Sequence, residues 1–330
     1  MKILITGGTG FIGQHLVRKL VEEGHQCRCL TRNRQTAKTI FRDLPIDFFE
    51  GDVCQKNSLK GSGEGIDAAF HLAAEGHTGA VSDEDTKGFL AVNVTGTDNI
   101  IHECGQAGVK RFIHFSSTAA MGLPGADIID ETTPCRPKTP YQTSKYESEK
   151  AAFSACATYN MDAVILRPCL VYGPGNCDEF IKLCRLIKKG FFPRIGCGKN
   201  LTPLVHIDDV VQGAMKAVSH AKPGRIYLIA SHTSPPLAQI QKEIARALKI
   251  FRPYYYIPLW AAYIAAYLLE RISDINKTTP IVSRKNILSV ITDRTFDISS
   301  AKNDLQYQPE IDVKQGIPET ILWLQKNAYL

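Results

Sequence analysis

The residues Thr6-Gly7-Gly8-Thr9-Gly10-Phe11-Ile12-Gly13 lie between a short apolar run, Lys2–Thr6, and an amphipathic stretch, Gln14–Glu23. The run predicts a buried strand, and the stretch predicts a helix that ends at Gly24. Gly8, Gly10 and Gly13 have the spacing GxGxxG, which allows a tight turn, close approach of the backbone to a pyrophosphate, and close packing of helix on strand. The order of strand, glycine loop and helix therefore predicts a dinucleotide-binding site. The loop residues expected to contact the dinucleotide are Gly7, Gly10, Phe11, Ile12 and Gly13.

Strand-like and helix-like segments alternate along the chain after this loop. Further strands are predicted at Cys27–Leu30, Ile66–Leu72, Arg111–Phe115 and Ala163–Leu166, with helices around Asn93–Cys104 and at Tyr141–Tyr159. Such alternation requires a parallel sheet with helices on both faces. The expected fold class is therefore α/β, a doubly wound parallel sheet of the Rossmann type with a smaller C-terminal α/β substrate domain.

The chain has 330 residues, which exceeds the usual size of one domain. The alternation breaks after residue 172, and the following residues, up to 203, are rich in glycine and proline and are predicted to be mostly loop. Val205–Ser219 and Arg225–Ala230 are interpreted as a return to the sheet. We expect a dinucleotide-binding domain made of residues 1–172 and 204–230, and a substrate-binding domain made of residues 173–203 and 231–330.

The type of nicotinamide cofactor is decided at the end of the second strand, where an acid favours NAD and a basic residue favours NADP. This strand ends Leu30-Thr31-Arg32-Asn33-Arg34, with no acid. Arg32 is placed to bind a 2′-phosphate, so we expect NADP, with NAD as the alternative. The competing interpretation is that both arginines are solvated surface residues. After the third strand, Asp52 is a candidate for the adenine amino group, or for capping a turn.

A phenol and an ammonium lie four residues apart in Tyr141-Gln142-Thr143-Ser144-Lys145, and hence on one helix face. A nearby cation favours the phenolate of a tyrosine, so Tyr141 is a candidate to exchange a proton with a substrate oxygen. Hydroxyl residues follow the strand Arg111–Phe115, at the sheet edge where α/β proteins bind ligands. Ser117 is the expected partner of the substrate oxygen, with Thr118 and Ser116 as alternatives.

The order of motifs along almost the whole chain resembles that of the extended short-chain dehydrogenase/reductase family. The motifs that carry this resemblance are Thr6–Gly13, His71-Leu72-Ala73-Ala74, Asn93-Val94-Thr95-Gly96-Thr97, Ser116-Ser117, Tyr141–Lys145, Arg167-Pro168 with Val171-Tyr172-Gly173-Pro174-Gly175, Val205-His206-Ile207-Asp208-Asp209, Phe296-Asp297 with Ala301, and Gly316-Ile317. The resemblance implies a catalytic triad of Ser117, Tyr141 and Lys145, in which Lys145 also holds the nicotinamide ribose. It further implies that Asn93 orders the active site. The remaining cofactor contacts expected on this basis are Val53, Leu72, Ala73, Ala74 and Pro168.

Two branches of that family differ at positions that this sequence contains. Nucleotide-sugar epimerases and dehydratases usually carry an acid where this chain has Thr31, and often Arg-x-Phe-Asn where it has Arg167-Pro168-Cys169-Leu170. The chain is more similar to 3β-hydroxysteroid dehydrogenases and dihydroflavonol reductases. The expected reaction is therefore the interconversion of a secondary alcohol and a ketone on a hydrophobic molecule. The alternatives are a nucleotide-sugar epimerase or dehydratase with bound NAD, and a non-catalytic NADP-sensing regulator; retention of Tyr141 and Lys145 argues for an enzyme.

A helix is also predicted in the apolar segment 257–269, where Trp260, Tyr263, Ile264, Tyr267 and Leu268 share one face. Four roles stay open for it: covering an apolar substrate, peripheral contact with a membrane, a dimer contact, and a buried structural helix. The segment is shorter than the roughly 20 residues of a spanning helix, so no transmembrane segment is expected.

Composition limits the remaining functions. Hydrophobic residues make up 44% and charged residues 22%, as in ordinary globular proteins. The net charge of +6 comes from scattered Lys and Arg rather than basic runs, so no nucleic-acid partner is expected. The ten cysteines show neither disulfide nor metal-site spacing, so we expect reduced thiols and no metal. A strand begins directly after Met1, which predicts a cytoplasmic protein. The family resemblance suggests a homodimer.

Overall fold

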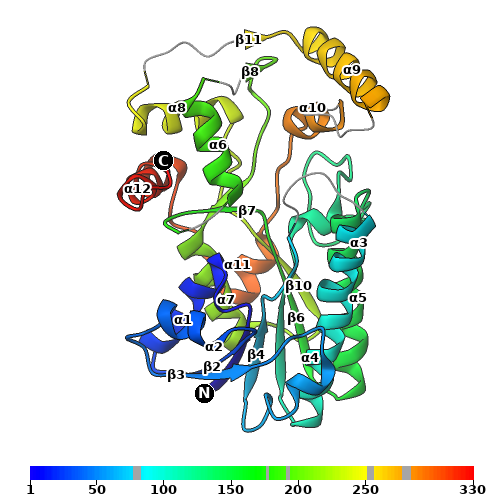
Figure 1. Cartoon of the computed structure of the whole chain (residues 1–330), viewed down its shortest axis with the longest axis vertical. Helices are drawn as coiled ribbons and strands as arrows, with labels where there is room; N and C mark the ends of the chain where they lie inside the picture. The colour runs from blue at the N-terminus through cyan, green and yellow to red at the C-terminus, as the bar shows by residue number, and fades with distance from the viewer. Residues whose placement is uncertain (77–82, 176–177, 191–193, 251–255, 277–283) are drawn as a thin grey trace. The chain divides into compact units, whose positions relative to one another are not determined.

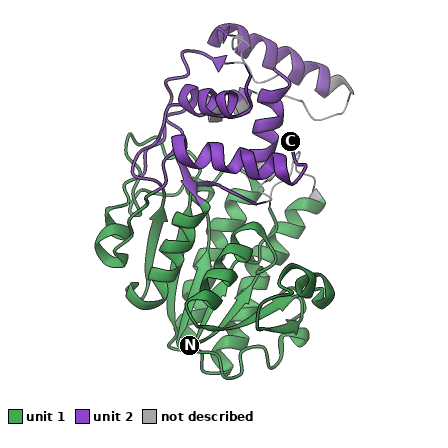
Figure 2. Ribbon diagram, turned by 90° about the vertical axis from the view of Figure 1, so that its left-hand side faces the viewer, with its two compact units in different colours: residues 1–169, 207–230, 297–310 green, residues 170–206, 231–296, 311–330 purple. Residues whose placement is uncertain are grey.

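The computed structural model describes residues 1–76, 83–175, 178–190, 194–250, 256–276 and 284–330 (Figure 1). The chain divides into two compact units (Figure 2). Unit 1 comprises residues 1–169, 207–230 and 297–310, and unit 2 comprises residues 170–206, 231–296 and 311–330.

Unit 1 is built on a seven-stranded sheet with the strand order β10-β6-β5-β4-β1-β2-β3. All of its neighbouring strands are parallel. The strands are β1 Lys2–Thr6, β2 Gln26–Thr31, β3 Ile46–Glu50, β4 Ala68–His71, β5 Arg111–Phe115, β6 Asp162–Pro168 and β10 Arg225–Ile229. The strand order reverses between β1 and β4, which opens a crevice at the carboxyl ends of these two strands. The predicted doubly wound fold is confirmed.

Helices cover both faces of this sheet. Figure 1 shows α4 and α5 on one side and α1 and α7 on the other, and each pair is in contact. The core between α4, α5 and the sheet contains Leu4, Ile100, Ala152 and Ile165, all fully buried. The helices of unit 1 are α1 Phe11–Glu22, α2 Arg34–Ile40, α3 Asp83–Phe89, α4 Gly96–Gln106, α5 Pro140–Thr158, α7 Ile207–His220 and α11 Ser299–Leu305, with single turns η1 Lys56–Leu59, η2 Leu90–Thr95 and η3 Thr118–Met121.

Unit 2 is mostly helical. Its elements are β7 Leu170–Tyr172, α6 Asp178–Lys188, β8 Arg194–Ile195, β9 Leu204–His206, α8 Leu237–Ala247, β11 Tyr256–Ile257, α9 Leu259–Asn276, α10 Arg284–Ile291 and α12 Val313–Lys326. The expectation of loop between 173 and 203 was wrong for α6. Phe180, Ile181, Cys184 and Ile187 form a helical apolar stripe that is buried against α8 and α12.

The observed units also differ from the expected domain boundaries. Residues 297–310, expected in the substrate-binding domain, belong to unit 1, because α11 packs on α7 and β10. Residues 170–172 and 204–206, expected in the sheet domain, form β7 and β9, which pair with each other in unit 2. Of the predicted return to the sheet, only Arg225–Ile229 joins the seven strands. No described helix has the length and apolar character needed to cross a bilayer.

Candidate active site

The turn after β1 is shaped by glycines that no other residue can replace without strain. Gly7 has φ +69°, and a Cβ there would lie 2.6 Å from the backbone nitrogen of Ala73. A Cβ on Gly13 would lie 2.2 Å from the carbonyl oxygen of Gly7, so α1 packs directly on the turn. Gly10 precedes α1 and provides no side-chain cap for its first N–H groups. These N–H groups at a helix N-terminus suit an anion such as a pyrophosphate.

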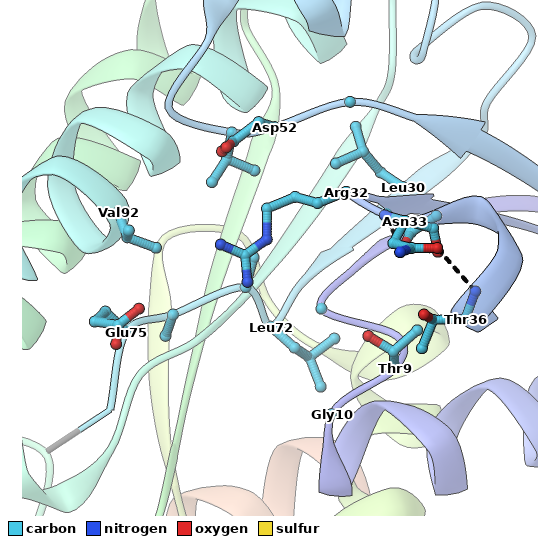
Figure 3. Close-up of a pocket in the computed structure, with 16 residues that line it drawn as sticks. Thr9, Gly10, Leu30, Arg32, Asn33, Thr36, Asp52, Leu72, Glu75 and Val92 are labelled. Carbon is cyan, nitrogen blue, oxygen red and sulfur yellow. Dashed lines mark hydrogen bonds between the residues drawn. The ribbon is translucent and has the colours of Figure 1, made fainter. Parts of the chain in front are cut away.

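A pocket of about 400 Å³ opens beside this turn, at the carboxyl ends of β1, β2 and β4 (Figure 3). It lies within unit 1. Eight of the predicted cofactor residues line it: Gly7, Gly10, Arg32, Asp52, Val53, Leu72, Ala73 and Ala74. Its other lining residues were not predicted to contact the cofactor; they are Thr9, Leu30, Thr31, Asn33, Thr36, Gly51, Glu75 and Val92.

The end of β2 places a cation in this pocket. Figure 3 shows the side chain of Arg32 extending into the pocket between Asp52 and Leu72. Thr31 stands at the position where an acid would favour NAD. Its hydroxyl donates to the carbonyl oxygen of Asn33 and accepts from the N–H of Asn33, both at 3.2 Å. The side chain of Asn33 in turn caps α2 by accepting from the N–H of Thr36 at 2.9 Å. The strand therefore ends in a turn that carries one positive charge into the pocket.

The helix α5 positions Tyr141 and Lys145. It begins with a capping box in which Thr139 and Gln142 bond to each other's backbone, with Pro140 in the first turn. Tyr141 lies in that first turn, and its ring meets the ring of Phe89 edge-on at 5.8 Å. Lys145 follows one turn later and is therefore on the same helix face.

The Lys145 side chain is buried against the end of β5. Its Nζ donates to the carbonyl oxygen of Phe115 at 2.7 Å. Burial lowers the pKa of this amine to about 8, and the nearby carboxylate of Glu149 opposes the shift. The ammonium form therefore still predominates at neutral pH, close to the strand end that carries Ser116 and Ser117.

A buried ion pair supports the same helix. Glu149 receives two hydrogen bonds from Arg167 of β6, at 2.9 and 2.6 Å, and both side chains are 2% exposed. The hydroxyl of Ser116 donates to the same carboxylate. The strands β5 and β6 and the helix α5 thus share one carboxylate, which fixes the helix on the sheet.

Asn93 connects α5 to the crevice. It lies in η2, a π-helical turn, and is 1% exposed. Its amide nitrogen donates to the Ser144 hydroxyl at 2.9 Å, and its amide oxygen accepts from the N–H of Glu75 at 2.8 Å. The Ser144 hydroxyl donates to the carbonyl oxygen of Tyr141 at 2.9 Å. Asn93 therefore fixes the first turn of α5 against the loop that follows β4.

The comparisons with known proteins agree with this arrangement. Residues 3–230 match the NAD dependent epimerase/dehydratase family, which covers more than half of the chain. The chain belongs to that family. Its members are NAD(P)-dependent enzymes, also described as extended short-chain dehydrogenases/reductases, so the chain is an enzyme of this class with a nucleotide cofactor and a small-molecule substrate.

Similar proteins come from both branches of the extended short-chain dehydrogenases/reductases. A putative dihydroflavonol 4-reductase of Synechocystis sp. is 28% identical, covering 99% of this chain and 95% of its own. A dTDP-D-glucose 4,6-dehydratase of Bos taurus is 27% identical, covering 99% and 90%. A decarboxylating sterol-4-alpha-carboxylate 3-dehydrogenase of Mus musculus is 27% identical, covering 97% and 90%. The crystal structure of gox2253 superposes with a TM-score of 0.83 at 25% identity, covering 99% of both chains, and supports the fold.

Some residues predicted from the family motifs lie outside the pocket lining. These are Phe11, Ile12, Gly13, Asn93, Tyr141, Lys145 and Pro168. Gly13 acts through packing, as described above. The ring of Phe11 contacts His15, 5.6 Å away on the same helix. Pro168 ends β6, at the same carboxyl edge of the sheet as Phe115, which pairs with Leu166 in the register.

The hydroxyls after β5 have different partners. Ser117 accepts from the N–H of Ala119 at 3.1 Å and caps η3, which is the turn chemistry that its sequence context allows. A hydroxyl that accepts one bond still carries a proton to donate. Ser116 is 6% exposed and donates to Glu149, so it is buried in the support of α5. Ser117 is therefore the better candidate for contact with a substrate.

Glu149 and its buried partners were not predicted from the sequence. One signal was available: Glu149 follows Lys145 by four residues, and hence lies on the same face of α5. The buried imidazoles of His71, named above only as part of a motif, and of His114 were not predicted to take part in this packing. The centroids of their stacked rings are 5.4 Å apart, and burial lowers the pKa of His71 to about 3, with the charge of Lys145 adding to the shift. Both residues belong to strands of the sheet and are buried.

Proposed function

We propose that the protein is an NADP-dependent oxidoreductase that interconverts a secondary alcohol and a ketone on a hydrophobic small molecule. The observation that carries the cofactor assignment is Arg32 in the pocket, next to Thr31 at the position where an acid would favour NAD. A guanidinium there suits a 2′-phosphate through a charge-assisted, bidentate contact. The glycine turn and the uncapped start of α1 fit the pyrophosphate of the same cofactor.

The chemistry is assigned to Tyr141, Lys145 and Ser117. In the direction of reduction, Tyr141 gives its proton to the carbonyl oxygen while the carbonyl carbon gains a hydride, so that a secondary alcohol forms. When bound, NADPH would supply that hydride and leave as NADP⁺. Lys145 would hold the nicotinamide ribose and keep a positive charge on the helix face that carries Tyr141. Ser117 donates to the substrate oxygen and stabilises the charge that develops on it.

A hydrophobic substrate is supported by the relatives of the reductase branch and by the residues after β6. The Synechocystis sp. and Mus musculus relatives are described as a reductase and a sterol dehydrogenase. Arg167-Pro168-Cys169-Leu170 departs from the Arg-x-Phe-Asn of many nucleotide-sugar enzymes. A second candidate function, a nucleotide-sugar epimerase or dehydratase with bound NAD, is favoured by the Bos taurus relative, which is nearly as similar. A non-catalytic NADP sensor is disfavoured by the presence of Tyr141 and Lys145 together. We also propose a homodimer, to be tested by light scattering of the purified protein.

The decisive experiment is thermal unfolding with NADPH or NADH. A ligand that binds only the native state raises its stability, by about 2.7 kcal/mol at a concentration of 100 Kd. We expect a larger rise in Tm with NADPH. A screen of apolar ketones with the better cofactor follows, and Tyr141→Phe should abolish turnover while the NADPH-induced rise in Tm is kept. Co-purification of NAD, with turnover of a nucleotide sugar and of no apolar ketone, would overturn the proposal.

A further inference from the structure

Helix α9 exposes several large apolar side chains to solvent, whereas two of its alanines are buried. Trp260 is 68% exposed, Ile264 53% and Leu268 54%, whereas Ala262 and Ala266 are 6% and 1% exposed. The two alanines pack on Ile287 of α10. Tyr263 packs on the same cluster, and Ala265 is exposed. Since the burial of large apolar groups drives folding, the exposure of Trp260, Ile264 and Leu268 is not explained by the core of unit 2. We call this exposed face, Trp260, Ile264, Tyr267, Leu268 and Ile272, the α9 face.

Cations lie within the α9 face. The guanidinium of Arg271 is 5.5 Å from the centre of the Tyr267 ring, and that of Arg284 is 5.3 Å from it. Arg284 also pairs with Glu270 at 2.7 Å. The exposed apolar stripe from Trp260 to Ile272 is about 18 Å long. With aromatic residues and arginines beside it, it has the composition of a helix that lies in a membrane interface.

The net charge of unit 2 favours an anionic lipid surface over a second copy of the chain as the partner of the α9 face. Its sequence segments hold 17 Lys and Arg against 8 Asp and Glu, a net charge of +9, whereas the complete chain carries +6 and unit 1 therefore −3. Two copies that met through the α9 face would bring two such cationic units together, which opposes association. An anionic lipid surface attracts the same charge, by roughly 1 kcal/mol for each Lys or Arg near it.

We propose that the α9 face binds to the surface of a membrane that contains anionic lipid, with the helix parallel to the membrane plane. Trp260, Ile264 and Leu268 enter the boundary between headgroups and acyl chains, and Arg271 and Arg284 contact the phosphates. The protein is held peripherally, because one apolar helix face and a few cations give reversible attachment. This inference does not depend on which cofactor is bound or which reaction occurs.

The test uses the full chain and vesicles of phosphatidylcholine, with or without about one third phosphatidylglycerol. The chain has two tryptophans, and Trp323 of α12 stacks on Tyr329, which follows the helix. Trp323→Phe therefore leaves Trp260 as the only indole and keeps an aromatic ring for the stacking. We expect co-sedimentation with anionic vesicles, weakened by salt, and a blue shift of Trp260 fluorescence that brominated lipid quenches.

The matched variants are Leu268→Glu, which is 54% exposed on α9, and Leu322→Glu, which is 67% exposed on α12 in the same unit. Both positions are solvent-exposed, and each change adds one negative charge. The α9 variant should lose at least about tenfold in vesicle partitioning, because burial of one aliphatic side chain is worth that factor or more. Leu322→Glu should lose little.

Three outcomes overturn the proposal: no binding to anionic vesicles, equal loss in both variants, or a dimer that the α9 variant dissociates while vesicles bind neither protein. NADPH-induced stabilisation of the same samples reports the proposed function separately.

Discussion

The cofactor pocket and the support of α5 belong to one sheet but are built by opposite means. Around β1 and β2 the pocket consists largely of backbone and small residues, and its one cation, Arg32, is exposed. Beneath α5, by contrast, Lys145, Glu149 and Arg167 are charged and at most 3% exposed. The pocket thus depends on space that must stay empty of side chains, whereas the helix depends on charges that must stay paired. Substitutions in the two regions should therefore fail for different reasons.

The largest effect should come from Arg167→Met. This change removes the cationic partner of the buried Glu149 carboxylate, which should lower the free energy of unfolding by about 3–5 kcal/mol. The double variant Arg167→Met/Glu149→Leu removes both charges and should recover much of that loss, since a well-packed apolar pair can replace a buried ion pair. Urea denaturation of the three proteins measures this. If the double variant is no more stable than the single one, pairing of charge is not what α5 depends on.

Gly13→Ala tests the glycine turn, whose stability should depend on free space rather than on paired charges. Its Cβ would lie 2.2 Å from the Gly7 oxygen and 2.7 Å from the Gly8 Cα, so the turn must shift, at a cost of up to about 3 kcal/mol. The rise in Tm that NADPH causes should nearly vanish in this variant. Gly88→Ala in α3, where no atom lies within 4 Å of the new Cβ, is the control and should gain up to about 1 kcal/mol. Equal changes in stability and in the NADPH-induced rise in Tm for the two variants would contradict the steric argument.

Acid should destabilise the protein through the buried imidazoles near α5. Burial lowers the pKa of His71 from 6.5 to about 3, so between these values the unfolded chain binds a proton that the folded chain does not. The stability from this group is complete above pH 6.5 and is lost as the pH falls towards 3, by about 2 kcal/mol at pH 5. His71→Gln should flatten this part of the pH profile of unfolding free energy. A wild-type profile that is already flat from pH 7 to 5 would refute the prediction.

Arg32→Ser should have the smallest effect on stability, within about 0.5 kcal/mol, because Arg32 is exposed. Its effect should appear in cofactor selection instead. Loss of the contact to a 2′-phosphate should weaken NADPH about tenfold or more and leave NADH nearly unchanged. Fluorescence titration of both cofactors measures the ratio. Equal weakening of NADH and NADPH would mean that Arg32 does not contact the group that distinguishes them.

The parts of the site that could be predicted from the sequence are those whose geometry is local. The spacing of Gly8, Gly10 and Gly13 fixes one turn, and Tyr141 and Lys145 are joined by one helical turn. The fold of the sheet could be predicted because strand-like and helix-like segments alternate along the chain. Arg32, Asp52 and Ala73 converge on one pocket because parallel strands end at one edge of the sheet.

The rest depends on contacts between residues far apart in the chain. The pairing of Glu149 with Arg167 joins a helix to a strand 18 residues later, and Ser116 reaches the same carboxylate from 33 residues away. No spacing rule connects them. The helix α6 was missed because the glycines and prolines around it outweighed its apolar stripe, and residues 297–310 were misplaced because nothing local reveals that α11 packs on α7.

The strand order has a consequence for synthesis of the protein. The edge strand β10 is Arg225–Ile229, so a growing chain that has completed β6 must produce the first segment of unit 2 and α7 before the sheet can be finished. Until then β6 is an open edge, with unpaired N–H and C=O groups that invite pairing with another nascent chain. The chain passes between the two units five times, so neither can be excised as one continuous fragment. Expression of residues 1–206 alone should therefore give aggregates rather than a smaller folded protein.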